Sequence, residues 1–102
     1  MKLLIITSIE EDLKAVSSIM EKAAITVFSV SETIGHKTEE HDYLPDNWFG
    51  KNDDGVNALF FFSFTEDEKA VHAIELVKHL NAEQKKNFPI RAFISPVEMT
   101  SY

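Results

Sequence analysis

Apolar residues along the first third of the chain follow two periods, one typical of strands and one typical of a helix. Residues 3–7 form a short continuous apolar run, which is typical of a central strand. The next apolar positions recur at helical spacing and share one face: Leu13, Val16, Ile19, Met20 and Ala23. Residues 25–34 are rich in β-branched side chains and alternate, so they predict a second strand, which Gly35 ends.

The second half of the chain repeats the order strand, helix, strand. Residues 58–64 predict a third strand and residues 90–95 a fourth, while the polar residues 81–87 predict a loop. The helix between these strands has an apolar stripe of Val71, Ile74, Val77 and Leu80, flanked by Ala70 and Leu76. The order βαββαβ predicts an α+β, ferredoxin-like fold, with a four-stranded antiparallel sheet and both helices on one face.

Both helices are predicted to begin at a capping box. Ser8 precedes Glu11 by three residues, and Thr65 precedes Glu68 by the same spacing. In this motif the hydroxyl accepts a hydrogen bond from a backbone N–H of the first turn, and the carboxylate accepts one from the backbone N–H of the cap residue. The spacing therefore predicts that Ser8 and Thr65 cap the two helices.

A long segment with neither period separates the second and third strands. Loop 36–57 holds six carboxylates, two lysines, two histidines, a tyrosine and a tryptophan. Connections longer than about 12–15 residues within a compact domain are usually functional or disordered. We therefore expect loop 36–57 to be the working part of the protein.

The first and third strands lack the alternation of a sheet with one face in water. Apolar side chains point both ways: Leu3 and Ile5 against Leu4 and Ile6, and Phe60, Phe62 and Phe64 against Leu59 and Phe61. Burying each such side chain contributes about 1.5–3 kcal/mol. We therefore predict that the face opposite the helices is buried between subunits of a closed cyclic oligomer. The alternative is cover by the C-terminal tail, residues 97–102, which is short for that purpose.

Composition narrows the classes of protein. The 102 residues are 44% hydrophobic, which is enough for one domain, residues 1–102, with its own core. The net charge of −7 makes nucleic acid an unfavourable partner. The chain has no cysteine, which excludes disulfides and fits a reducing compartment. No apolar run is long enough for a signal-peptide core or a membrane span, so we expect a cytoplasmic protein with no direct membrane insertion.

Imidazole and carboxylate side chains gather at the start of loop 36–57. His36, Glu39, Glu40, His41 and Asp42 lie within seven residues. Such groups suit zinc, copper or nickel, but their spacing matches no established zinc motif. Two alternatives stay open. One is a metal site at His36, His41 and Asp42, and the other is a solvated acidic loop whose histidines bind no metal.

Three large apolar side chains, Tyr43, Trp48 and Phe49, lie on the same acidic loop. They predict either anchors in an interface with a partner protein, where such residues are enriched, or packing of the loop onto its own or a neighbouring subunit. The sequence contains no nucleophile elbow, phosphate loop or metalloprotease helix. We therefore do not expect an enzyme.

Residues 25–35, ITVFSVSETIG, resemble the second strand of the P-II signalling proteins, and loop 36–57 is similar in position and length to their T-loop. The resemblance covers most of the chain. It implies a ferredoxin-like homotrimer with inward-facing sheets, which binds an adenine nucleotide or another small effector in clefts between subunits. It also implies that the loop docks on a transporter or an enzyme. The resemblance places the ligand at Gly35, Lys37, Lys85 and Arg91.

The chain departs from the P-II pattern where those proteins have a glycine- and lysine-containing phosphate loop. Residues 81–88, NAEQKKNF, contain no glycine, and Arg91 is the only arginine. Residues 48–51 and 95–97 instead resemble CutA proteins, which are similar trimers associated with divalent-metal tolerance. A metal-binding trimer is therefore one alternative, so the cofactor is left open between a nucleotide and a divalent metal.

An ACT-like amino-acid-sensing module is the last alternative, because ACT domains share the order βαββαβ. Those domains usually place a glycine-containing turn after their first strand. Here the corresponding residues 7–10 read TSIE and contain no glycine. The ACT-like interpretation therefore ranks behind the two trimers.

Overall fold

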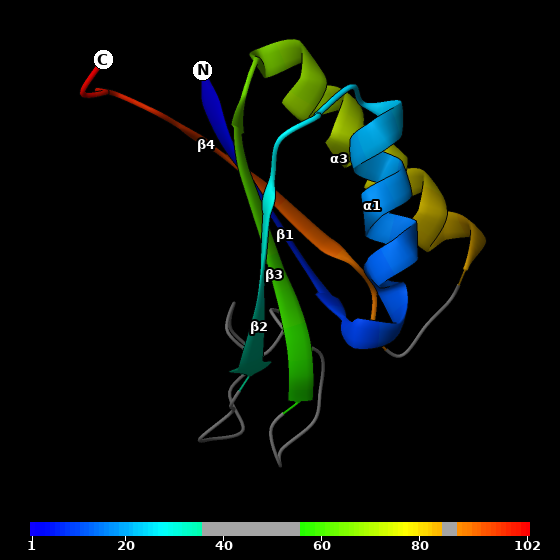
Figure 1. Ribbon diagram of the computed structural model, residues 1–102. Helices are drawn as coiled ribbons and strands as arrows, with labels where there is room; N and C mark the ends of the chain where they lie inside the picture. Colours follow the sequence, from blue (N-terminus) through cyan, green and yellow to red (C-terminus); the bar gives the residue numbers. More distant parts are fainter. Residues whose placement is uncertain (36–55, 85–87) are drawn as a thin grey trace, which may run out of the picture.

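The structure is a computed structural model that describes residues 1–35, 56–84 and 88–102. The elements are strand β1 (Lys2–Ile9), 3-10 helix η1 (Glu10–Asp12), helix α1 (Leu13–Lys22), β2 (Ser29–Gly35), β3 (Val56–Thr65), α3 (Asp67–Glu83) and β4 (Arg91–Pro96). The strands form one antiparallel sheet in the order β2-β3-β1-β4, and both helices lie on one face of it (Figure 1). The predicted α+β class is confirmed, and the arrangement is consistent with a ferredoxin-like fold.

The strands differ in length from the predicted ones. β1 and β3 are longer, because they pair with each other over eight residues, from Lys2–Thr65 to Ile9–Ala58. β3 also takes in residues 56 and 57, which were predicted to belong to the loop; residues 36–55 lie outside the described residues. β2 begins only at Ser29, so the prediction of a strand from residue 25 is wrong at its start.

The core lies between the sheet and the two helices. Alternate residues of β1 and β3 point toward the helices, as the register of the two strands requires. The largest fully buried side chain is Phe61, whose ring packs against Phe28 at a centroid distance of 6.3 Å. The other members of this packed cluster come from the sheet, both helices and the segments that flank them: Leu4, Ile6, Val16, Ile19, Met20, Ala23, Ile25, Leu59, Ala70, Ala73, Val77 and Ile90.

Both predicted capping boxes are wrong. Ser8 lies inside β1, which pairs with β3 as far as Ile9, and its hydroxyl donates to the Ile9 carbonyl oxygen at 3.0 Å. The N-cap of α3 is Glu66 rather than Thr65, and it makes no side-chain cap hydrogen bond. Long-range strand pairing therefore decides where these helices begin. The acidic residues of η1, just before α1, and of the first turn of α3 interact favourably with the helix dipoles.

The apolar stripes of the two helices are narrower than predicted. Leu13 and Val71 are 44% and 51% exposed, so neither belongs to the core. α3 instead buries the small residues Ala70 and Ala73, which allow a close approach to the sheet. α3 also extends to Glu83, so the predicted loop 81–87 is wrong for its first three residues.

Helix α1 ends at a residue in the left-handed region that is not glycine. Ala24 has φ of 60°. Its N–H donates to the Glu21 carbonyl oxygen at 3.0 Å, and the Ile25 N–H donates to that of Met20 at 2.9 Å. This is the hydrogen-bond pattern of a Schellman motif, in which glycine usually occupies the position of Ala24. A Cβ atom in this region costs about 1–2 kcal/mol.

Replacing Ala24 with glycine is expected to raise the free energy of unfolding by about 1 kcal/mol, because the steric cost of the Cβ disappears and the greater unfolded-state entropy of glycine offsets only part of it. In a domain of this size the gain corresponds to a rise in Tm of about 4–8 °C. Urea denaturation measures the change. The matched control is Ala23→Gly, where φ is −83° and no strain is relieved; it should lower stability. A destabilised Ala24→Gly variant would contradict the assignment of strain.

Candidate functional site

The face of the sheet opposite the helices carries a continuous apolar surface. We call it the open face and define it by Leu3, Ile5, Phe60, Phe62, Phe64 and Phe93. The strand register places Phe64 opposite Leu3, and both Phe62 and Phe93 opposite Ile5. Within the described ranges, no helix or strand lies over this face (Figure 1). The predicted doubling of apolar faces is therefore present in the structure.

Three phenylalanine rings form a row along β3 on the open face. The centroids of Phe60 and Phe62 lie 5.9 Å apart, and those of Phe62 and Phe64 lie 6.5 Å apart in an edge-on arrangement. Phe64 is 57% exposed, while Phe60 and Phe62 are half-buried. Aromatic surface of this size favours burial against another protein surface over contact with water.

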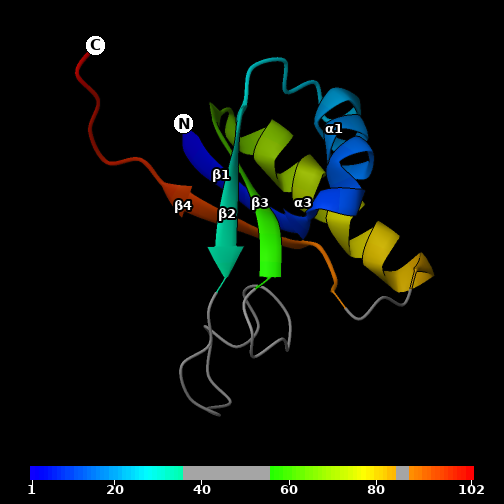
Figure 2. The same ribbon diagram turned by 60° about the horizontal axis from the view of Figure 1, so that its bottom comes forward.

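The C-terminal tail, residues 97–102, does not cover the open face. Figures 1 and 2 show it running away from the sheet after β4. Met99 and Tyr102 are 88% and 89% exposed. The tail returns to the domain through the Tyr102 hydroxyl, which lies 3.6 Å from the sulfur of Met1. Cover by the chain's own tail, the alternative left open by the sequence, is therefore not what the structure shows.

Two of the four predicted ligand-binding residues, Gly35 and Arg91, lie at the same end of the sheet but at opposite edges. Gly35 is the buried last residue of β2, and Arg91 is the half-buried first residue of β4. β3 and β1 lie between these strands, which sets β2 and β4 about 14 Å apart at three strand spacings. The other two predicted residues, Lys37 and Lys85, lie outside the described residues. One protomer therefore does not bring Gly35 and Arg91 onto a single small ligand.

Two carboxylates line a pocket of about 330 Å³ next to the end of β2. Its lining residues are Glu10, Glu32, Thr33, Ile34 and Asn57. A lining with two acidic side chains repels phosphate groups. This pocket therefore does not suit the phosphates of a nucleotide.

One side chain, Asn81, holds the start of β4 against the last turn of α3. Its Nδ2 donates to the Ile90 carbonyl oxygen at 2.7 Å, and the Ile90 N–H donates to its Oδ1 at 3.2 Å. Ile90 is 2% exposed, so one amide satisfies both backbone groups of a buried residue next to Arg91. This role of Asn81 was not predicted, because residues 81–87 were predicted to form a loop. The signal was an amide at a helix end, where polar side chains often bind the backbone.

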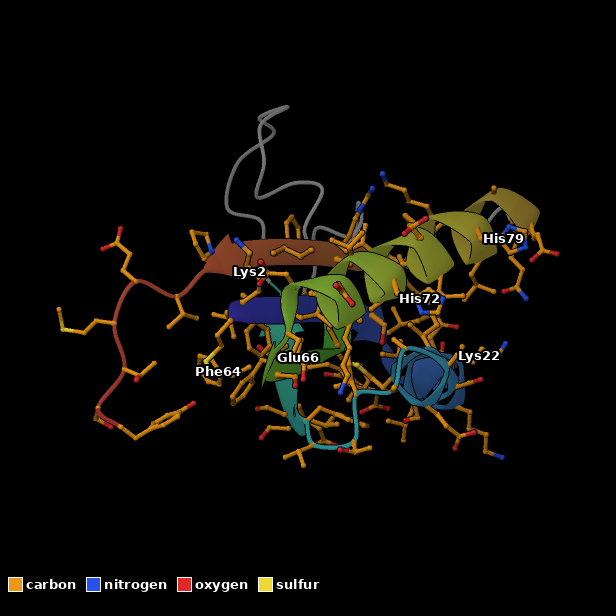
Figure 3. All side chains as sticks on the ribbon, turned by 90° about the horizontal axis from the view of Figure 1, so that it is seen from above. Lys2, Lys22, Phe64, Glu66, His72 and His79 are labelled. Atoms are coloured by element: carbon orange, nitrogen blue, oxygen red, sulfur yellow. The ribbon has the colours of Figure 1, made fainter. Side chains whose placement is uncertain are left out.

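The predicted metal ligands His36, His41 and Asp42 lie outside the described residues, as do the predicted partner anchors Tyr43, Trp48 and Phe49. Elsewhere, in residues 1–35, 56–84 and 88–102, no three histidine or acidic side chains gather as a metal site requires. His72 and His79 both project from the outer side of α3 (Figure 3), and Nε2 of His79 lies 3.1 Å from Oε1 of Glu83. The metal hypothesis therefore depends on residues 36–55 alone.

A groove of about 530 Å³ lies at the end of the sheet where β3 ends and β2 begins. We call it the β3-end groove; its walls are Met1, residues 24–27 and residues 63–65, and Glu66 and the first turn of α3 form its rim. Phe64 and Glu66 mark this end of the molecule in Figure 3. The Ser63 hydroxyl donates to the Val27 carbonyl oxygen across it at 2.7 Å. Nothing in the hydrophobic pattern predicts this groove.

Comparisons with known proteins add no family to these observations: no protein-family model and no curated protein matches the sequence. The resemblance to the P-II proteins therefore stays a hypothesis carried by residues 25–35 and by the place of the long loop in the chain. Among the described helices, none is long and apolar enough to cross a membrane.

Proposed function

We propose that the protein is a regulatory homotrimer similar to the P-II proteins. It binds a small effector in clefts between its subunits and docks on a partner protein through the segment that joins β2 to β3. The observation that carries the proposal is the open face, six apolar side chains that no described helix or strand covers. Full burial of such a side chain contributes about 1.5–3 kcal/mol, and the area that each still exposes in one copy contributes its share, so association of copies through this face is favoured.

The charge pattern of the sheet supports association of identical copies. Side chains from the four strands alternate between the two faces, and by register those on the open side include Arg91 but no carboxylate among the described strand residues. A chain of net charge −7 would otherwise repel its copies. Interface cores are depleted in charged residues, as this face is.

The separation of Gly35 and Arg91 supports a site that two copies share. The two residues lie at opposite edges of one sheet but at the same end of it. In a cyclic trimer two different surfaces of each copy meet, and in the proposed trimer these are the β2 edge of one copy and the β4 edge of the next. Such an arrangement places the Gly35 of one copy and the Arg91 of its neighbour around one cleft.

Binding of an adenine nucleotide at millimolar concentration is expected to raise Tm and to slow proteolysis of residues 36–55. A ligand at a hundred times its Kd adds about 2.7 kcal/mol of stability. Arg91→Ala should abolish both effects, because it removes the positive charge that is proposed to bind the nucleotide phosphates at the cleft. Lys78→Ala, which removes an exposed cation from α3, should leave both unchanged.

A nucleotide panel that leaves Tm and proteolysis unchanged would exclude the nucleotide form of the proposal. Zinc and copper are screened beside the nucleotides. Stabilisation by either metal, lost when His36 and His41 are both replaced by alanine, would favour the metal-binding trimer instead.

A further inference from the structure

The β3-end groove lies next to a stretch of β3 that is paired on one side. The ladder between β2 and β3 stops at the pair Ser29–Phe62, while β3 continues to Thr65. Over the described residues, Phe64 and Thr65 have ladder partners on β1 alone. Successive residues of a strand direct their backbone N–H and C=O groups to opposite edges of the strand. One of the two residues, Phe64 or Thr65, therefore directs these groups toward the groove.

The opposite wall of the groove is extended backbone that leaves the sheet. Residues 25–28 belong to no helix or strand, and the hydrogen bond from the Ser63 hydroxyl to Val27 stands where ladder bonds would otherwise continue. The Val27 side chain is exposed. A strand with unpaired backbone groups beside an open groove is the arrangement that accepts an added strand.

The tail, residues 97–102, is a segment with the properties of such a strand. It belongs to no helix or strand, and all its residues except Val97 are exposed. Valine, threonine and tyrosine favour strands, and six extended residues span about 20 Å. No tail residue lines the groove of its own chain, and the tail contacts a groove residue there through Tyr102, whose hydroxyl lies 3.6 Å from the sulfur of Met1. The tail leaves β4, which β1 separates from β3, and runs away from the sheet (Figures 1 and 2).

We propose that the β3-end groove binds residues 97–102 of a second copy as an added strand. Among the described residues, three stretches outside the helices and strands are long enough to pair as an added strand: residues 24–28, 88–90 and 97–102. The first forms the groove wall, and the second is held by Asn81 through the buried Ile90. The tail is the one of these three stretches whose residues, except Val97, are all exposed.

One residue, Phe64, is shared by the open face, the groove and the surface next to the tail. Phe64 belongs to the open face, lines the groove, and lines the hollow of about 260 Å³ beside the tail. Two copies that associate through their open faces therefore bring a tail and a groove to the border of the same interface. The inference rests on the proposed oligomer. It adds a donor segment and an acceptor groove on every copy, which is a head-to-tail contact that closes into a ring.

Disulfide trapping tests the proposal cleanly because the chain has no cysteine. Val27→Cys in the groove wall is combined with Met99→Cys in one variant and with Thr100→Cys in another, so that both faces of the tail are sampled. The control combines Val27→Cys with Lys78→Cys, an exposed position on α3. On oxidation of the full-length protein, covalent oligomers should form about 10²–10⁴-fold faster in the tail variants than in the control, because the cysteines are held together.

The outcomes separate this inference from the proposed function. Sedimentation of each variant before oxidation gives the oligomeric state. An oligomer whose tail cysteines trap no faster than the control, or form only intramolecular disulfides, overturns the inference and leaves the proposed trimer standing. A monomer overturns both. An excess of a synthetic peptide with the sequence of residues 95–102, SPVEMTSY, should slow trapping in the tail variants.

Discussion

Phe62→Glu is expected to turn the oligomer into folded monomers. Phe62 lies at the centre of the open face, between Phe60 and Phe64 and opposite Ile5. A carboxylate there is taken out of water, and identical charges on the other copies repel it. Central aromatic residues of an interface contribute most of its energy. We expect a loss of at least about 4 kcal/mol, which weakens association roughly a thousandfold.

Sedimentation velocity at micromolar protein measures this change. The monomer should stay folded, since Phe62 points away from the core and is half-buried in a single copy. Val71→Glu is the matched control, because Val71 is an exposed apolar residue on α3, outside the open face. Its sedimentation should equal that of the unsubstituted protein. A monomeric unsubstituted protein, or an oligomeric Phe62→Glu variant, would contradict the assignment of the open face as an interface.

The layers of the fold could be predicted from the sequence because they follow from periodicity. Side chains alternate along a strand, so the phenylalanines of β3 had to divide between two faces, whatever the strand's neighbours were. The register shows Phe61 on the helix side and Phe62 on the other. The two helices follow in the same way from apolar residues at helical spacing. These features need only local information.

The ends of the elements could not be predicted, because contacts distant in sequence decide them. Ser8 has a favourable capping sequence, but pairing of β1 with β3 draws it into the strand. Residues 25–28 have strand composition, yet β2 begins after them, where the ladder with β3 begins. The left-handed conformation of Ala24 is likewise absent from the sequence signal, since glycine is the usual residue there.

Only part of the candidate site could be predicted from the sequence. Gly35 and Arg91 were predicted as ligand residues through the resemblance to the P-II proteins, and both lie at one end of the sheet. Their placement at opposite edges depends on strand order, which the hydrophobic pattern does not give. The same strand order leaves the last residues of β3 unpaired on one side. The β3-end groove is therefore a property of topology.

Phe61→Ala is expected to lower the free energy of unfolding by about 3–5 kcal/mol, the usual cost of removing a large buried aromatic side chain. Phe61 is fully buried, and its ring contacts Phe28 in the middle of the core. The loss is a large part of the stability of a domain, which is about 5–15 kcal/mol. It combines the lost burial of the ring with the cavity left beneath the helices.

Urea denaturation of Phe61→Ala is best measured in the Phe62→Glu background, because association of copies would otherwise add to the apparent stability. Phe64→Ala in the same background is the control; its ring is 57% exposed in one copy, so its loss should be much smaller. The order of the two losses is decisive. If Phe64→Ala destabilised the monomer more than Phe61→Ala, the assignment of the two faces of β3 would be reversed, and with it the open face.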